Sequence, residues 1–296
     1  MATILLQTTI VDTPDDWHVG RFSLLADELR RAGHDVTARN RDASEDDSTL
    51  RQLDALDVDQ LWLFAVDTGG GLSAADAAGI TRFRERGGGV FTARDHQDLG
   101  SCLLRLGSIG RVNHFHTLSP EADARRDDLD NPNISWPNYH SGANGAYQPV
   151  FAIEPVHELL RTARTPGGRI EWFPAHPHEG AVSAPDDEPT ARAIAHGRST
   201  VTGRRFNLAV CIDGETTPDG RPLGRAVACS TFHHFADLNW DPAAGAPSFV
   251  TDVPSDEIVR DPERLDIFKD YVHNIARWLS GKAGRGDGSS RDVVQA

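Results

Sequence analysis

The most restrictive feature of the sequence is an uninterrupted apolar run over residues 61–66, Leu-Trp-Leu-Phe-Ala-Val, which stands between Gln60 and Asp67. A strand with one solvated face alternates polar and apolar residues, whereas a strand covered on both faces is apolar throughout. The run is also much shorter than the roughly 18 residues that a membrane span needs. It therefore predicts a central strand of a parallel sheet that has helices packed on both sides.

The first hundred residues alternate between strand-like and helix-like patterns. Further strands are expected at residues 4–6, 34–38 and 90–93, and helices at residues 22–33 and 73–85. The second of these helices opens with Ser-x-x-Asp, which is typical of a capping box. Strands that alternate with helices form a parallel sheet with right-handed crossovers. We therefore predict an α/β fold, a flavodoxin-like three-layer sandwich with a mostly parallel sheet.

The remainder of the chain is less regular. Pro, Asn, Asp and Gly accumulate after residue 107, and we expect residues 107–204 to form a long, irregular loop insertion over the active face. Residues 205–212 alternate polar and apolar side chains, and a turn-rich stretch joins them to an apolar strand at 225–230, which predicts a β-hairpin extension.

The end of the chain contains one more expected helix. Pro262 follows Asp261, a pair that is typical of a helix start, and apolar residues then recur at helical spacing as far as Leu279. We therefore expect one domain over residues 1–280 and a flexible tail over residues 281–296.

The composition limits the expected partners. Asp and Glu number 44 and Lys and Arg number 30, for a formal net charge of −14. Such a chain repels the phosphates of nucleic acids and of anionic membranes, so neither is an expected partner. The three cysteines form no disulfide or zinc pattern, and the N-terminus lacks the features of a signal peptide. We expect a cytoplasmic protein with a small-molecule ligand, and a homo-oligomer is compatible with the sequence.

Three polar segments follow predicted strands at their carboxyl ends, where open α/β sheets bind ligands. The first contains Gly69 and Gly70. Glycines allow backbone N–H groups to converge on an anion or a developing oxyanion. The alternative is a flexible turn that precedes the helix at Ser73.

The second polar segment follows the strand at residues 90–93 and contains Arg94, Asp95, His96 and Gln97. A histidine beside carboxylates is a candidate general base or metal ligand. The alternative is a helix start in which Asp95 caps the helix and His96 is only solvated.

The third polar segment follows the late strand and contains His233, His234, Asp237 and Trp240. Adjacent residues at a strand end point in opposite directions, so at most one of the two histidines faces a given site. The alternative is one buried and one exposed histidine without a functional role.

The three segments, in this order, resemble the class I glutamine amidotransferase-like superfamily, most nearly its trehalose-utilisation (ThuA-like) branch. The resemblance covers residues 2–105 and 205–279. It implies that the Gly69–Gly70 loop is an oxyanion loop, that residues 93–97 form the turn that carries the nucleophile, and that the late strand supplies a histidine.

The nucleophile position departs from the superfamily pattern, because Ala93 stands where a cysteine would be. Alanine cannot attack an amide, so a Cys-dependent glutaminase is not expected. Cys102 is expected to be a small core residue, and a glutaminase would require it to reach the Gly69–Gly70 loop. ThuA-like proteins also lack the nucleophile and carry a histidine in this region, to which His96 is similar.

Histidine is abundant, with 13 in the chain, and many lie in predicted loops. His176 and His178 have alternating spacing, which on an extended chain places both rings on one side. Together with His96 and His234 they are candidate ligands of a divalent metal such as zinc. The alternative is a pocket of neutral imidazoles without metal, and the sequence makes no cofactor certain.

These observations predict a hydrolase or isomerase of a small polar substrate, for which a sugar-like molecule is one alternative. Asp95 and His96 are expected to supply acid–base or metal chemistry, with His233 or His234 assisting. Further expected roles are orientation of the histidine ring by Asp237, stabilisation of negative charge by Gly69 and Gly70, and substrate binding by Arg94, Gln97 and Trp240. The alternative function is a non-catalytic ligand-binding or scaffold protein on the same fold.

Overall fold

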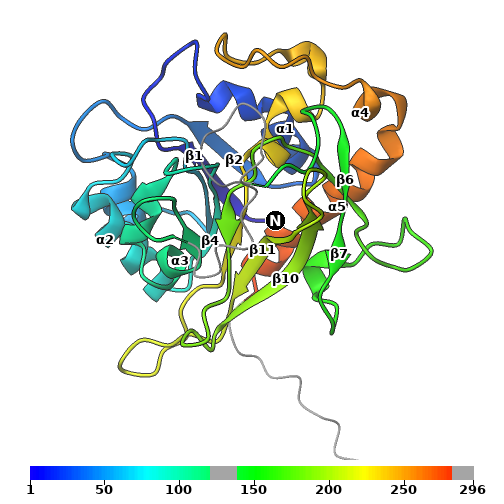
Figure 1. Ribbon diagram of the computed structural model, residues 1–296. Coiled ribbons are helices and arrows are strands. Elements are labelled where there is room, and N and C mark those ends of the chain that lie inside the picture. The colour runs from blue at the N-terminus through cyan, green and yellow to red at the C-terminus, as the bar shows by residue number, and fades with distance from the viewer. Residues whose placement is uncertain (121–138, 282–296) are drawn as a thin grey trace, which may run out of the picture.

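The computed structural model describes residues 1–120 and 139–281. At its centre is an eight-stranded sheet with the strand order β2-β1-β3-β4-β12-β11-β10-β7 (Figure 1). All neighbours from β2 to β12 are parallel, and the pairings from β12 to β7 are antiparallel. The predicted fold class, a flavodoxin-like α/β sandwich with a mostly parallel sheet, is confirmed.

The elements have the following bounds. The strands of the central sheet are β1 (Thr3–Thr8), β2 (Asp35–Arg39), β3 (Gln60–Phe64), β4 (Gly89–Ala93), β7 (Phe151–Ala152), β10 (Ala191–Arg198), β11 (Arg205–Ile212) and β12 (Ala226–Cys229). Two small two-stranded sheets contain β5 (Asn113–His114) with β9 (Ala181–Val182), and β6 (Tyr147–Pro149) with β8 (Trp172–Pro174). The α-helices are α1 (Ser23–Arg31), α2 (Ala74–Glu85), α3 (Ser108–Arg111), α4 (Glu257–Arg260) and α5 (Pro262–Leu279).

The apolar run identified in the sequence forms β3 and the residues after it, and it is buried on both faces as predicted. Trp62 and Phe64 pack into a core cluster with residues of α1 and α5. Leu61 and Leu63 point to the other face and pack with residues of α2. Figure 1 shows α2 and α3 on one side of the sheet and α1 and α5 on the other. The sheet is therefore the middle layer of three.

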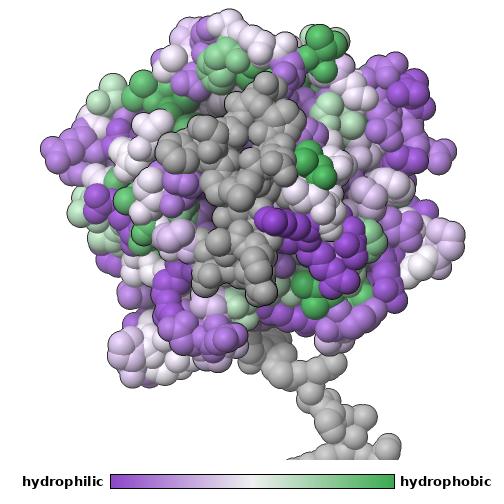
Figure 2. Space-filling view, in the orientation of Figure 1, coloured by the Kyte–Doolittle hydropathy of each residue, from purple (hydrophilic) through white to green (hydrophobic). Residues whose placement is uncertain are grey.

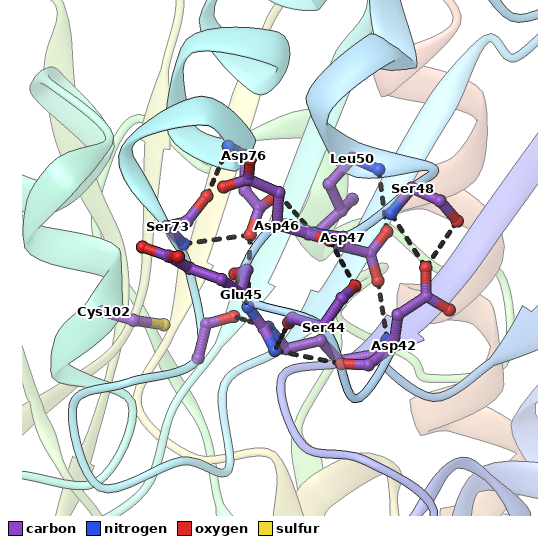
Figure 3. A network of polar contacts seen from close by, with 12 residues as sticks. Asp42, Ser44, Glu45, Asp46, Asp47, Ser48, Leu50, Ser73, Asp76 and Cys102 are labelled. Atoms are coloured by element: carbon purple, nitrogen blue, oxygen red, sulfur yellow. Dashed lines mark hydrogen bonds and ion pairs between the residues drawn. The ribbon is translucent and has the colours of Figure 1, made fainter.

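The predicted capping box at the start of α2 is present (Figure 3). The Asp76 N–H donates to Ser73 Oγ at 3.1 Å, and the Ser73 N–H donates to Asp76 Oδ2 at 2.9 Å. Asp76 Oδ1 also accepts from the Asp47 N–H at 2.8 Å, and Asp47 Oδ1 accepts from the Leu50 N–H at 2.9 Å. The carboxylates of this acidic loop are thus occupied in holding the loop against α2.

The second half of the chain contains the predicted hairpin and last helix, together with a strand that was not predicted. β11 and β12 pair antiparallel, and α5 begins at Pro262. β10, which lies within the predicted insertion over 107–204, extends the sheet beyond β11. Register shifts at Ala193–Ala195 and Ala195–His196 interrupt its alternation, so its sequence lacks a clear strand period.

Some predictions concern residues outside the described part of the chain. These are the tail, apart from Gly281, and residues 121–138 of the expected insertion. Within the described residues, no helix combines the length and apolarity required to cross a bilayer. On the face seen in Figure 2, hydrophilic residues predominate among the coloured atoms and hydrophobic residues lie in small groups, as expected for a chain of net charge −14.

Candidate functional site

A cleft of about 570 Å³ lies at the carboxyl ends of the parallel strands. Polar and aromatic residues that follow β1, β3, β4 and β12 all contribute to it, as the fold rule for ligand sites in open α/β sheets predicts. Its lining comprises Asp16, Trp17, Val66, Thr68, Asp95, His96, Gln97, Leu99, Asn144, His176, Pro177, His178, Phe232, His233, Phe249, Val250, Thr251 and Asp252.

The floor of the cleft is a carboxylate surrounded by histidines. Asp95 lies just beyond the end of β4 and is only 2% exposed. Its Oδ2 is 3.1 Å from His96 Nδ1 and 3.3 Å from His233 Nε2, and its Oδ1 is 3.4 Å from His176 Nε2. The His176 and His233 rings stack with centroids 3.6 Å apart. We call Asp95, His96, His176, His178 and His233 the cleft cluster.

A close backbone approach brings the loop of His176 and His178 to the end of β4. The Gly180 N–H donates to the Ser230 carbonyl at 3.1 Å. A Cβ atom at position 180 would lie 2.5 Å from the Asp95 carbonyl oxygen and 2.8 Å from that of Ser230. Only glycine fits between these two backbones without displacing them, so Gly180 allows histidines from two distant loops to meet at Asp95.

A second carboxylate cluster lies directly behind the first. Glu179 is fully buried, and it accepts hydrogen bonds from Ser141 Oγ (2.7 Å), Ser230 Oγ (2.6 Å), His234 Nε2 (3.1 Å) and the amide of Gln148. We call these five residues the inner cluster. Since Glu179 follows His178 and His234 follows His233, the two clusters share the same two loops.

Burial sets the charge of the cleft cluster. It lowers the pKa of His178 to about 4, with a smaller effect from His96. It also lowers the pKa values of His176 and His233, so neutral imidazoles are favoured there. Burial alone would raise the pKa of Asp95, but the charges that His96 and His233 can carry hold it well below the usual value. The site therefore pairs an ionised carboxylate with imidazoles at His176, His178 and His233 whose neutral form is favoured.

His234 and Asp237 were predicted to act in the cleft, but the structure places both elsewhere. His234 turns away from the cleft and contacts Glu179, so the candidate metal ligand is not beside the others. Asp237 does not orient a histidine ring. Its carboxylate accepts from Ser23 Oγ at 2.6 Å and from the Leu24 N–H at 2.9 Å, and thereby caps the start of α1.

Two of the expected substrate-binding residues have structural contacts instead. The Trp240 indole is 6% exposed and donates to the His234 carbonyl at 2.9 Å. The guanidinium of Arg94 donates to the carbonyls of His114 and Gln97, both at 2.6 Å, and lies over the Phe115 ring. Arg94 therefore fixes the loop that carries His96. Gln97 does line the cleft, with a φ of 53°.

The glycine loop after β3 was predicted to form an oxyanion hole. The Gly69 N–H does not serve this role, because it already donates to Asp67 Oδ1 at 2.7 Å. Cys102 does approach this loop, and its Sγ lies 2.9 Å from Asp67 Oδ2. However, Cys102 is 1% exposed, and burial together with Asp67 raises the pKa of its thiol well above the usual value. Such a thiol is not a nucleophile. Ala93, the residue at the nucleophile position, is the last residue of β4.

Several cleft residues were not predicted from the sequence. Trp17 packs edge-on against His233, with ring centroids 4.5 Å apart. Asn144 is 3% exposed and contacts His176 Nδ1 at 3.1 Å. Phe249 lies at the cleft rim, where the Ser248 N–H donates to Asp15 at 2.7 Å. The position of Trp17 after β1 is the one sequence signal that could have identified it.

Comparisons with known proteins identify the fold but no family. No family model and no curated protein matches the chain. A putative ThuA-like protein from Parabacteroides merdae is similar in structure, with a TM-score of 0.51, 13% identity, and coverage of 96% of this chain and 92% of that one. A cytoplasmic protein of Salmonella typhimurium has a TM-score of 0.50 and 11% identity, over 94% and 98% of the two chains. At these identities the similarity shows a shared fold.

Proposed function

We propose that this protein is an enzyme that performs acid–base chemistry, as a hydrolase or isomerase, on a small uncharged polar molecule bound in the cleft. The observation that carries the proposal is the cleft cluster, in which the buried Asp95 carboxylate lies within 3.1–3.4 Å of nitrogen atoms of three histidines. Perturbed titratable groups that converge at the floor of a cleft are typical of active sites.

His96 and His178 are the histidines of the cluster best placed to exchange protons with a substrate. Both line the cleft, and their ring centroids are 5.2 Å apart. The pKa of His178, about 4, keeps its imidazole neutral at pH 7, so one ring nitrogen offers a lone pair to a hydrogen-bond donor of the substrate. A positive charge that develops on His96 would be stabilised by Asp95, whose Oδ2 is 3.1 Å from His96 Nδ1. Asp95 is therefore placed to orient the His96 ring.

The lining of the cleft supports an uncharged substrate. Among the described residues that line it there is no lysine or arginine, whereas Asp16, Asp95 and Asp252 are acidic. Substrate phosphates and carboxylates would find no cationic partner there. Trp17 and Phe249 offer flat apolar faces, and His96 and Gln97 offer hydrogen-bonding groups, a combination that suits small polar molecules.

The test is a turnover screen with the purified protein against neutral saccharides, lactones and small amides, followed by NMR. His96→Gln should lower turnover of any substrate found by about 100-fold or more, the usual contribution of a general acid or base. The matched control is His196→Gln, since His196 lies on β10 and stacks on Phe151. Equal turnover by wild type and His96→Gln would contradict the proposed role. A ligand that stabilises the protein without being converted would favour the non-catalytic alternative.

We also propose a cytoplasmic location. Its support is that all three cysteines are free and buried, as expected in a reducing compartment. Expression with a C-terminal fluorescent tag and cell fractionation would test the location, and recovery in the secreted fraction would contradict it.

A further inference from the structure

The hydrogen bonds around His176 determine which of its ring nitrogens carries the proton. The chain of contacts begins at Asn239, whose side-chain orientation is fixed by the backbone. Its Oδ1 accepts from the Gly145 N–H at 2.6 Å, and its Nδ2 donates to the His233 carbonyl at 2.9 Å. A backbone N–H is always a donor and a carbonyl always an acceptor, so the amide of Asn239 cannot be reversed.

The orientation of Asn239 fixes that of Asn144. Asn239 Nδ2 also donates to Asn144 Oδ1 at 3.0 Å, so this atom of Asn144 is the oxygen. The same oxygen lies 3.1 Å from His176 Nδ1. Because an oxygen accepts, His176 Nδ1 must be the N–H donor. In neutral His176 the lone pair is therefore on Nε2.

This lone pair faces another acceptor. His176 Nε2 lies 3.4 Å from Asp95 Oδ1, and neither atom has a hydrogen-bond partner among the described residues. His176 is 3% exposed and Asp95 is 2% exposed. Two buried, unpartnered acceptors that face each other at this distance repel unless a proton or a metal cation lies between them. A second proton on His176 would place a buried imidazolium ion in a stack on the His233 ring, whose centroid is 3.6 Å away.

We propose that Asp95, His176 and His233 bind a divalent transition-metal ion at the floor of the cleft. One donor atom from each of these residues lies within 4.8 Å of the other two. His233 Nε2, at 3.3 Å from Asp95 Oδ2, completes the set when its proton moves to Nδ1, which has no hydrogen-bond partner among the described residues. This metal site is an addition to the acid–base function proposed above, and the inference of a metal does not depend on that function.

The donor set indicates the class of metal. Two imidazole nitrogens and one carboxylate oxygen suit zinc, iron, cobalt or manganese, whereas calcium and magnesium prefer oxygen ligands alone. Three protein ligands leave coordination positions open, and these would face the cleft. Asn144 is then a positioning residue, because it holds His176 in the tautomer that presents Nε2.

The experiment is a metal titration of the full chain after treatment with a chelator, without any substrate. Zinc binding is measured by calorimetry, and cobalt binding by its visible absorption spectrum. We expect one equivalent of metal per chain. Asp95→Asn and His176→Gln should weaken binding at least 100-fold, whereas His196→Gln should leave it unchanged. Circular dichroism confirms that each variant is folded.

Two variants of Asn144 test the positioning role. Asn144→Asp keeps an oxygen that accepts from His176 Nδ1 and should retain binding, whereas Asn144→Leu removes the acceptor and should weaken binding about 10- to 100-fold. Wild-type protein that binds no stoichiometric metal, or that binds it as tightly after Asp95→Asn, would overturn the proposal. Equal binding by Asn144→Leu and wild type would overturn the positioning role. Because turnover is not measured, neither result bears on the acid–base function.

Discussion

The cleft cluster and the inner cluster each centre on a buried carboxylate, and two loops contribute to both, but the clusters differ in how their carboxylates are satisfied. Both oxygens of Glu179 accept hydrogen bonds, from Ser141, Ser230, His234 and Gln148. Asp95 Oδ1 has no such partner among the described residues, although Asp95 is nearly as buried. A folded protein tolerates an unsatisfied buried carboxylate chiefly where function requires it.

The difference separates a structural carboxylate from a functional one. The inner cluster fixes the two loops, because Glu179 accepts from donors in two other parts of the chain, residues 141–148 and residues 230–234. The cleft cluster uses the loops that are fixed in this way. We therefore expect changes in the inner cluster to alter stability first, and changes in the cleft cluster to alter binding and turnover first.

The largest effect is expected from Glu179→Ala. The substitution leaves His234, Gln148, Ser141 and Ser230 buried without their shared acceptor, and breaking such a buried network typically costs about 3–5 kcal/mol. Urea denaturation of the metal-free protein would measure the loss, and Glu179→Gln should recover part of it. A loss smaller than about 1 kcal/mol would contradict the structural role of the inner cluster.

Substitutions of the two adjacent histidines, His233 and His234, form a matched pair whose expected effects are of intermediate size. His234→Gln removes a donor to Glu179 and should destabilise the protein by about 1–3 kcal/mol, with little change in metal affinity once the protein is folded. His233→Gln should have the opposite pattern, a small change in stability and a large loss of metal binding. Parallel denaturation and zinc titration check both variants. The same pattern in both would remove the distinction between the clusters.

Asp95→Asn is expected to have a smaller effect on stability, and to stabilise the metal-free protein where most substitutions destabilise. The amide that replaces the carboxylate is able to donate to His176 Nε2 and to accept from His233 Nε2, which removes the conflict between two acceptors. The metal-free variant should therefore be more stable than metal-free wild type by about 1 kcal/mol, the usual value of one hydrogen bond. Thermal and urea denaturation would measure the difference. A clear destabilisation would show that Asp95 holds the fold together.

A last effect, which appears only at acidic pH, concerns acid sensitivity. The folded pKa of His178 is about 4, below the unfolded value of about 6.5. The unfolded chain therefore binds more protons as the pH falls through this window, and folding stability decreases from about pH 6.5 towards pH 4. His178→Gln should reduce this decrease. Urea midpoints at pH 7, 6 and 5 would test it, and identical pH slopes for the two proteins would contradict it.

The alternation of strands and helices in the first hundred residues, the location of the cleft and part of its floor could be predicted from the sequence. The apolar run and the capping box identify β3 and α2, and polar residues after β4 and β12 lie in the cleft as strand ends should. The prediction that only one of His233 and His234 faces the cleft agrees with the structure, where they contact different carboxylates, although they lie in a 3-10 helix and not at the strand end that the prediction assumed.

The remaining residues depend on loops whose path the sequence does not indicate. After β12 the chain forms successive 3-10 helices over His233–Phe235 and Asp237–Asn239. These redirect Asp237 to α1 and Trp240 to the core, against the predictions that Asp237 orients a histidine ring and that Trp240 binds the substrate. Asn144 contacts His176 across 32 positions of sequence. No local pattern predicts such a contact, because it depends on how two irregular segments pack.

In each of the pairs His178–Glu179 and His233–His234, the first residue belongs to the cleft cluster and the second to the inner cluster. This arrangement limits how the sequence of the protein can change in evolution. A single inserted or deleted residue just before either pair would shift its residues by one position and thereby disturb both clusters at once. The lengths of these two loops should therefore be invariant among its orthologues. The rim over residues 245–253, which contains Phe249, is free of this constraint, so gaps should accumulate there as substrate preferences diverge.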